Sequence, residues 1–312
     1  MTLEGIVAAS ASLGRQDSKD ATVDLATPAR WGLAALTLVA GVAALAARSI
    51  PGVTAQVIYG VAVAALLLGL SMMAKRSARL APYSRLPFVL FVFAVVQVLN
   101  NSIPPFVLTN VLHEQTSNGN PLASSVAGTV VIQLVEAVIA VGAIIVLVRM
   151  AGLDLGSIYA RFGRFGAAHV IAIVAFVGVY LVIGLSPTAH RMLPIQGEMT
   201  LGRYLALTPA LLIMVISNGF EEEFLFRGLV LQPYTALFGW FGANILQALI
   251  FAFAHVGITY TPNALFFILV AVFPLGLVAG RLMRHSDGVV APAIFHAAVD
   301  IPIYLAFLTF AS

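Results

Sequence analysis

Residues 204–232 read YLALTPALLIMVISNGFEEEFLFRGLVLQ, a long apolar run that carries three adjacent glutamates and one arginine. A helix rises about 1.5 Å per residue, so roughly 20 apolar residues cross the ~30 Å hydrocarbon core of a bilayer. A charged group near the centre of such a span costs at least about 2.5–3.5 kcal/mol on insertion scales, and such groups are functional candidates for that reason. The stretch therefore predicts a membrane-spanning helix with a functional site inside it.

Similar apolar stretches fill most of the 312 residues. Hydrophobic residues make up 61% of the chain and charged residues only 9%, and the mean hydropathy is +1.01. This composition is typical of a polytopic membrane protein, and we predict an all-α transmembrane helix bundle with about 8–9 spans. The apolar stretches run approximately over 31–47, 52–74, 86–112, 123–148, 166–185, 204–232, 236–256, 262–280 and 289–310.

Three regions follow from this division. Residues 1–30 form a polar N-terminal tail, residues 31–200 the N-terminal transmembrane helices, and residues 201–312 a helical core that carries the candidate site. The third apolar stretch contains Asn100-Asn101 and Pro104-Pro105. Because proline removes a helical hydrogen bond, we expect this span to be kinked or discontinuous.

The basic residues predict the orientation of the bundle. Twelve of the 16 Lys and Arg residues fall on one side of the predicted bundle: Arg15, Lys19, Arg30, Lys75, Arg76, Arg79, Arg85, Arg149, Arg161, Arg164, Arg281 and Arg284. The positive-inside rule places that side, and with it the N-terminus, in the cytoplasm. We therefore expect a protein integral to the plasma (inner) membrane. The lipid bilayer is the expected partner and nucleic acid is not, because the basic residues are scattered over short loops.

Three C-terminal apolar stretches hold the candidate site. We predict that Glu222, His255, His296 and Asp300 lie within about 10 Å of one depth, near the middle of the bilayer, when each helix is counted from its expected inner end. Glu223 and Arg227 lie four positions apart on one helix, and so do His296 and Asp300. Glu223 can therefore pair with Arg227, and Asp300 can hold one nitrogen of His296. One turn before His255, Phe251 is expected to pack against its ring. Glu221 is expected to face elsewhere, and Glu136 is a lone carboxylate in the fourth span.

Several kinds of intramembrane protease lack their signatures here. The chain has no cysteine, which excludes disulfides, a thiol nucleophile and a zinc site with cysteine ligands. No HExxH or Gly-x-Ser-Gly string occurs, and Asp300 is the one aspartate within the predicted spans. Metalloproteases of the HExxH type and serine and aspartyl intramembrane proteases are therefore not indicated.

A different set of motifs is present in order. Glu222-Glu223-Phe-Leu-Phe-Arg227-Gly228 reads EExxxRG, Phe251-Ala-Phe-Ala-His255 reads FxxxH, and His296-Ala-Ala-Val-Asp300 reads HxxxD. Over roughly residues 200–310 the chain resembles the CAAX-protease and bacteriocin-processing (CPBP) family, also called the abortive-infection family, which includes the type II prenyl-protein endopeptidases.

The resemblance implies an intramembrane endopeptidase whose partner is a membrane-associated peptide or protein substrate. It implies that Glu222 and His255 activate a water molecule, and that His296, helped by Asp300, stabilises the oxyanion. Glu223 and Arg227 would support Glu222 or orient the substrate. Prenyl-protein endopeptidases generally carry Asn at the position where this chain has Asp300. The aspartate here cannot donate a hydrogen bond when ionised, so a prenylated substrate does not follow.

Three alternatives stay open on the sequence. Zinc is a possible cofactor, because Glu222, His255 and His296 with water would complete an open catalytic site, although we expect no cofactor. Buried Glu, His and Arg also suit a proton-coupled transporter. A proteolytically idle membrane scaffold or immunity protein is the third alternative.

Overall fold

The computed structural model describes residues 27–117, 120–256 and 264–311. Helices account for nearly all of the described chain. The long helices are α2 (Thr27–Leu45), α3 (Val53–Arg76), α4 (Arg85–Phe106), α5 (Val126–Met150), α6 (Ala167–Leu185), α8 (Leu201–Glu222), α9 (Leu229–Ala254), α11 (Phe273–Ser286) and α12 (Val290–Phe310). Shorter helices are α7 (Pro187–Met192) and α10 (Ala264–Phe267). The predicted all-α polytopic bundle is confirmed.

Three short π-helical segments interrupt or extend these helices. They are Val107–Val111 after α4, Glu223–Gly228 between α8 and α9, and Ile268–Val272 before α11. A π turn contains one more residue than an α turn and is frequent at functional sites. The middle segment coincides with the EExxxRG motif.

Eight helical runs in the described chain are long and apolar enough to cross a membrane, which makes the chain an integral membrane protein. The longest run, Leu201–Ala254, has 54 residues, and a straight helix of that length would extend roughly 80 Å. Gly239 breaks it with φ 69° and ψ 165°, a conformation open mainly to glycine. The break falls close to the boundary between the spans predicted at 204–232 and 236–256.

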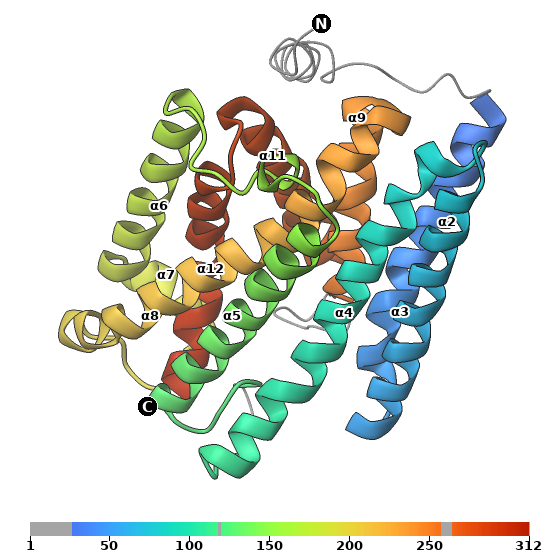
Figure 1. Cartoon of the computed structure of the whole chain (residues 1–312). Helices are drawn as coiled ribbons and strands as arrows, with labels where there is room; N and C mark the ends of the chain where they lie inside the picture. Colours follow the sequence, from blue (N-terminus) through green and yellow to red (C-terminus); the bar gives the residue numbers. More distant parts are fainter. Residues whose placement is uncertain (1–26, 118–119, 257–263, 312) are drawn as a thin grey trace, which may run out of the picture.

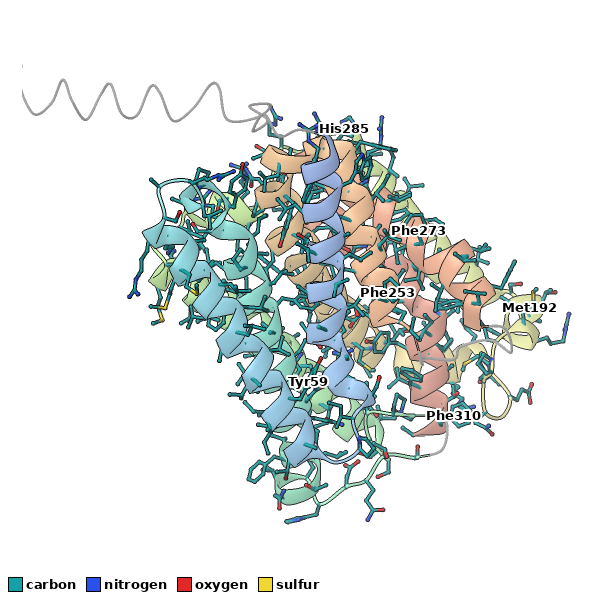
Figure 2. The ribbon with its side chains drawn as sticks, turned by 90° about the vertical axis from the view of Figure 1, so that its right-hand side faces the viewer. Tyr59, Met192, Phe253, Phe273, His285 and Phe310 are labelled. Carbon is teal, nitrogen blue, oxygen red and sulfur yellow. The ribbon has the colours of Figure 1, made fainter. Side chains whose placement is uncertain are left out.

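The bundle has two flanks and a centre. In Figure 1, α2, α3 and α4 stand together at one side, and α6 lies at the other side beside α12. Between them α8 runs obliquely and packs on both α5 and α12. Figure 2 places His285, near the end of α11, at one end of the bundle and Phe310 toward the other, so α12 runs between the two ends.

Two boundary predictions need comment. The predicted tail, residues 1–30, lies outside the described residues except for 27–30, which already belong to α2. The connection between the seventh and eighth predicted spans also falls on residues outside the description. The division of the chain at residue 200 stays a prediction.

The third span was expected to be kinked or discontinuous, and it is not discontinuous. Helix α4 continues through Pro104 and Pro105 to Phe106, and the widened π segment follows directly. Membrane helices tolerate proline where neighbouring groups and local π adjustments accommodate the freed carbonyls. The π segment after the two prolines is such an adjustment.

Candidate active site

Helices α8 and α12 approach each other closely at the site. A Cβ atom on Gly219 would lie 2.5 Å from the carbonyl oxygen of Ala293, so only glycine permits this spacing. One turn farther along α8 come Glu222 and Glu223, and one turn farther along α12 comes His296. The close approach therefore brings the carboxylates of the first motif onto the imidazole of the last.

Glu223 is the hub of the buried charges. Its Oε1 atom lies 2.8 Å from the guanidinium of Arg227 and 2.8 Å from Nδ1 of His296. The side chains of Glu223 and Arg227 are 0% exposed, and that of His296 is 2% exposed. The contact with Arg227 is an ion pair, and a buried charge needs such an opposite charge beside it. Glu223 therefore fixes both a cation and the orientation of the catalytic-candidate imidazole.

The second nitrogen of His296 lies between two carboxylates. Its Nε2 atom is 3.4 Å from Glu222 Oε2 and 3.8 Å from Asp300 Oδ1. The other oxygen of Asp300 accepts a hydrogen bond of 2.9 Å from Asn218. Asp300 was expected to hold one nitrogen of the His296 ring, but at 3.8 Å it is too distant for a hydrogen bond. Glu223 holds Nδ1 of the ring instead, and Asp300 accepts its hydrogen bond from the side-chain amide of Asn218 on α8.

Phe251 packs among the three basic groups. Its ring centroid is 4.6 Å from that of His255 and 5.6 Å from that of His296, and the Arg227 guanidinium lies 4.2 Å from it. Nδ1 of His255 lies 2.9 Å from the carbonyl oxygen of Phe251. Since a carbonyl only accepts, Nδ1 is the donor, and the neutral ring carries its lone pair on Nε2. The packing expected for Phe251 is present.

All four candidate catalytic residues line one cavity of about 330 Å³. Glu222 is the accessible carboxylate among the adjacent pair, with 21% of its side chain exposed against 0% for Glu223. The structure therefore brings Glu222, His255, His296 and Asp300 together, and it holds Glu223 and Arg227 behind them. Their catalytic roles stay predictions.

The earlier helices also contribute to this cavity. Asn100 of α4 donates to Glu221 Oε1 at 2.8 Å, and Gln133 of α5 approaches Oε2 at 3.3 Å. The expectation that Glu221 faces elsewhere is wrong, because the cavity extends around α8 toward these amides. Arg48 and Glu136 line it as well. The site is therefore not confined to the C-terminal core.

Sequence reasoning missed Asn218, Gln133 and Tyr304. The Tyr304 hydroxyl donates to Gln133 Oε1 at 2.7 Å, and Asn218 supports Asp300. Two of them carried a readable signal: Asn218 lies four residues before Glu222, and Tyr304 lies four after Asp300. That spacing continues the site-facing stripe of each helix. Gln133 stands on a distant helix and gave no such signal.

The proposed metal ligands do not assemble into a metal-binding group. Among the described residues, no three or more His, Asp or Glu side chains are arranged to hold an ion. His296 has one nitrogen committed to Glu223, and His255 has one committed to a backbone carbonyl, which leaves Nε2 of each ring open. Metal-bound imidazoles commonly donate their other nitrogen in this way, so zinc at Glu222, His255 and His296 stays a prediction.

Comparison with known proteins identifies the C-terminal helices. The family model described as type II CAAX prenyl endopeptidase Rce1-like matches residues 204–302. The match runs from the first turn of α8 into α12 and includes all three motifs. No curated protein and no solved structure matches the chain. Residues 204–302, with the three motifs that they carry, are therefore similar to this family of membrane peptidases.

Proposed function

We propose that the protein is an intramembrane endopeptidase that hydrolyses a peptide bond with a water molecule activated by Glu222 and His255. The observation that carries this proposal is the convergence of one accessible carboxylate and two imidazoles on a single cavity. The fixed tautomer of His255 leaves Nε2 as an acceptor, and the Glu222 carboxylate is a second acceptor. Together they supply the general base that a hydrolytic water requires.

His296 has the complementary role. Its Nδ1–H is held by Glu223, and its Nε2 faces Glu222 and Asp300, two groups that accept hydrogen bonds. This surrounding favours a proton on Nε2, which can be donated toward the oxyanion of the tetrahedral intermediate. Water adds to the scissile carbonyl carbon, and the base then returns its proton to the leaving amine. Atoms and charge balance without a further reactant.

Glu223, Arg227 and Phe251 position these groups. Glu223 fixes His296, Arg227 compensates the buried charge of Glu223, and Phe251 separates and orients the two imidazoles. Such preset donors and acceptors need no reorganisation during the reaction. Asp300 contributes through its approach to Nε2 of His296.

The substrate class is a membrane-associated peptide or protein, because the cavity is formed by helices that cross the bilayer. We further propose that the protein lies in the inner membrane with its N-terminus in the cytoplasm. The basic residues Arg161, Arg164, Arg281 and Arg284 support this orientation, because they gather at one end of the bundle. A prenyl group is not part of the proposal.

The test is peptidase activity of the purified full chain in detergent against a library of membrane peptides. Glu222→Gln and His255→Ala are each expected to lower the rate by about 10²–10⁴-fold. Glu198→Gln, a carboxylate in the loop before α8, is the matched control and should keep the wild-type rate. Activity that survives both site variants would overturn the assignment.

Two added arms separate the alternatives. Rates measured with and without a chelator should agree, whereas loss on chelation would show a metalloenzyme. Glu222-dependent proton flux into proteoliposomes, without any cleavage, would instead show a carrier.

A further inference from the structure

A second cavity, of about 480 Å³, lies at the end of the bundle marked by His285 in Figure 2 and shares no lining residue with the candidate active site. Three segments enclose it: the loop before α6, the turn around Gly239 in α9, and the last turn of α11. We call it the basic pocket. None of the residues that line it takes part in the proposed hydrolysis.

The basic pocket has a surplus of positive charge. Arg164, Arg281, Arg284 and His285 line it, and Asp287 is its one acidic residue. That aspartate is already engaged, since Oδ1 lies 2.6 Å from the guanidinium of Arg161. Within the described ranges, Arg164 and Arg281 have no ion pair of their own. Two guanidinium groups are thus available to an anion.

Neutral donors stand beside these charges. Trp240 lines the pocket, and its buried Nε1–H has no hydrogen-bond partner in the described part of the chain. Arg284 lies over the Trp240 ring at 4.8 Å from the centroid, which holds both side chains in place. Burial raises the pKa of Tyr159, so the hydroxyl of this pocket residue stays protonated at neutral pH.

The walls of the basic pocket are tied together by main-chain hydrogen bonds. The N–H of Arg164 donates to the carbonyl of Ser286, and the N–H of Val289 donates to that of Arg161 at 3.1 Å. These bonds join the loop before α6 to the turn between α11 and α12. The pocket is therefore formed before any ligand binds, and little ordering opposes binding.

Exposed aromatic residues indicate the depth of the pocket in the membrane. Phe162 and Phe165 flank the loop that carries Arg164 and are 60% and 68% exposed, and Phe241, next to Trp240, is 70% exposed. Aromatic side chains gather at the level of the lipid headgroups. The basic pocket thus opens where lipid phosphates are concentrated.

We propose that the basic pocket binds the phosphate group of an anionic membrane lipid. Arginine forks match phosphate oxygens in pairs, and basic pockets between membrane helices on the cytoplasmic side hold such headgroups. A soluble phosphate shares this chemistry, but the aromatic rim favours the lipid as the source. The proposal does not depend on the proposed peptidase activity.

Fluorescence of Trp240 offers a direct test. The chain has two tryptophans, so Trp31→Phe leaves Trp240 as the single reporter. The full chain in this background is titrated in detergent micelles with phosphatidylglycerol and, separately, with phosphatidylcholine. A saturable change with phosphatidylglycerol alone is expected, and an equal response to both lipids would overturn the proposal.

Matched charge removals locate the binding site. Arg164→Gln/Arg281→Gln is expected to weaken the apparent affinity for phosphatidylglycerol by about tenfold or more. Arg76→Gln/Arg79→Gln, at the last residue of α3 and in the loop after it, should change it less than about threefold. The single variant Arg281→Gln, which removes an exposed side chain, should give an intermediate loss and guards against misfolding of the double variant. Equal losses for the two double variants would overturn the proposal, because diffuse surface charge would then explain the binding.

Inorganic phosphate separates the two sources. At concentrations matched to the lipid it is expected to leave the titration unchanged. If it displaces the lipid at equal concentration, the pocket is a site for soluble phosphate and the lipid assignment is wrong.

Discussion

The cavity of the candidate active site and the basic pocket are both rich in charge, but they hold their charges differently. In the cavity the side chains of Glu223, Arg227 and His296 are almost completely buried and joined to one another. In the basic pocket Arg281 and Arg284 are exposed. Buried charges must be compensated permanently by the fold, whereas exposed charges are solvated until a ligand arrives. The first arrangement suits chemistry on a preset geometry, and the second suits reversible binding.

The largest expected difference is in stability. Arg227→Met leaves the carboxylate of Glu223 buried without its cation, so the free energy of unfolding should fall by about 3–5 kcal/mol. Arg281→Met removes an exposed guanidinium and should change it by less than about 0.5 kcal/mol. Reversible unfolding in mixed micelles with increasing dodecyl sulfate measures both. Similar losses for the two variants would erase the distinction between the regions.

A smaller effect is expected at Asp300, which touches His296 only at 3.8 Å. Asp300→Ala removes the carboxylate and also the acceptor of Asn218, so kcat should fall by about tenfold to a hundredfold. Asp300→Asn keeps a side chain that can hydrogen-bond to Asn218 and should retain most of the rate. Steady-state kinetics on a cleaved membrane peptide distinguish the two. If Asn restores no more activity than Ala, the negative charge itself is required.

Phe251 and Phe253 form a matched pair within one helix. Phe251 is 0% exposed and packs on Arg227, His255 and His296, whereas Phe253 is 44% exposed and is labelled on the side of the bundle in Figure 2. Phe251→Leu should lower stability by about 1–2 kcal/mol through the lost ring contact with Arg227 and lower kcat more than it raises KM. Phe253→Leu should leave both quantities near the wild-type values. A reversed order would contradict the proposed wedge between the imidazoles.

The smallest effect concerns Glu114, a half-buried residue whose carboxylate is held by hydrogen bonds. Its oxygens accept hydrogen bonds from the hydroxyls of Ser125 (2.7 Å) and Ser124 (3.1 Å), at the start of α5. The Ser125 hydroxyl lowers the pKa of Glu114 below 4.5, so the stabilisation is present above that pH and is lost as the pH falls through the lowered value. Glu114→Gln should cost at most about 0.5 kcal/mol after solvent screening.

Thermal unfolding at two pH values checks this last prediction. The difference between wild type and Glu114→Gln should be present at neutral pH and should shrink as the pH falls below 4.5 and through the lowered pKa of Glu114. A difference that persists in acid would assign the effect to shape and not to charge.

Much of the fold was predictable from the sequence because the bilayer imposes the length of each helix. The spans expected at 52–74 and 289–310 match α3 and α12 to within two residues. The pairing of Glu223 with Arg227 followed from their spacing, and the shared cavity followed from equal depths in three helices. These inferences use only the rise and turn of a helix.

Other features depend on how distant helices meet, which periodicity does not encode. Glu221 was misjudged because Asn100 and Gln133 approach it from α4 and α5. The sequence predicted that Asp300, four positions along the same helix, holds the ring of His296. In the structure Glu223 lies 2.8 Å from Nδ1 of that ring, whereas Asp300 lies 3.8 Å from Nε2. The continuation of α4 through its two prolines was missed, because the π adjustment behind them has no sequence signature.

The π-helical segment Glu223–Gly228 holds one residue more than an α turn would, beside the paired charges of Glu223 and Arg227. Deleting one residue after Arg227 would let the backbone relax into ordinary α geometry. The side chains of α9 would then keep their present faces, because the wide turn already takes up the extra residue. The same deletion in a regular stretch of α9 would rotate every following side chain by about 100° around the axis, so this segment is the place where the hairpin can lose a residue with the least rotation.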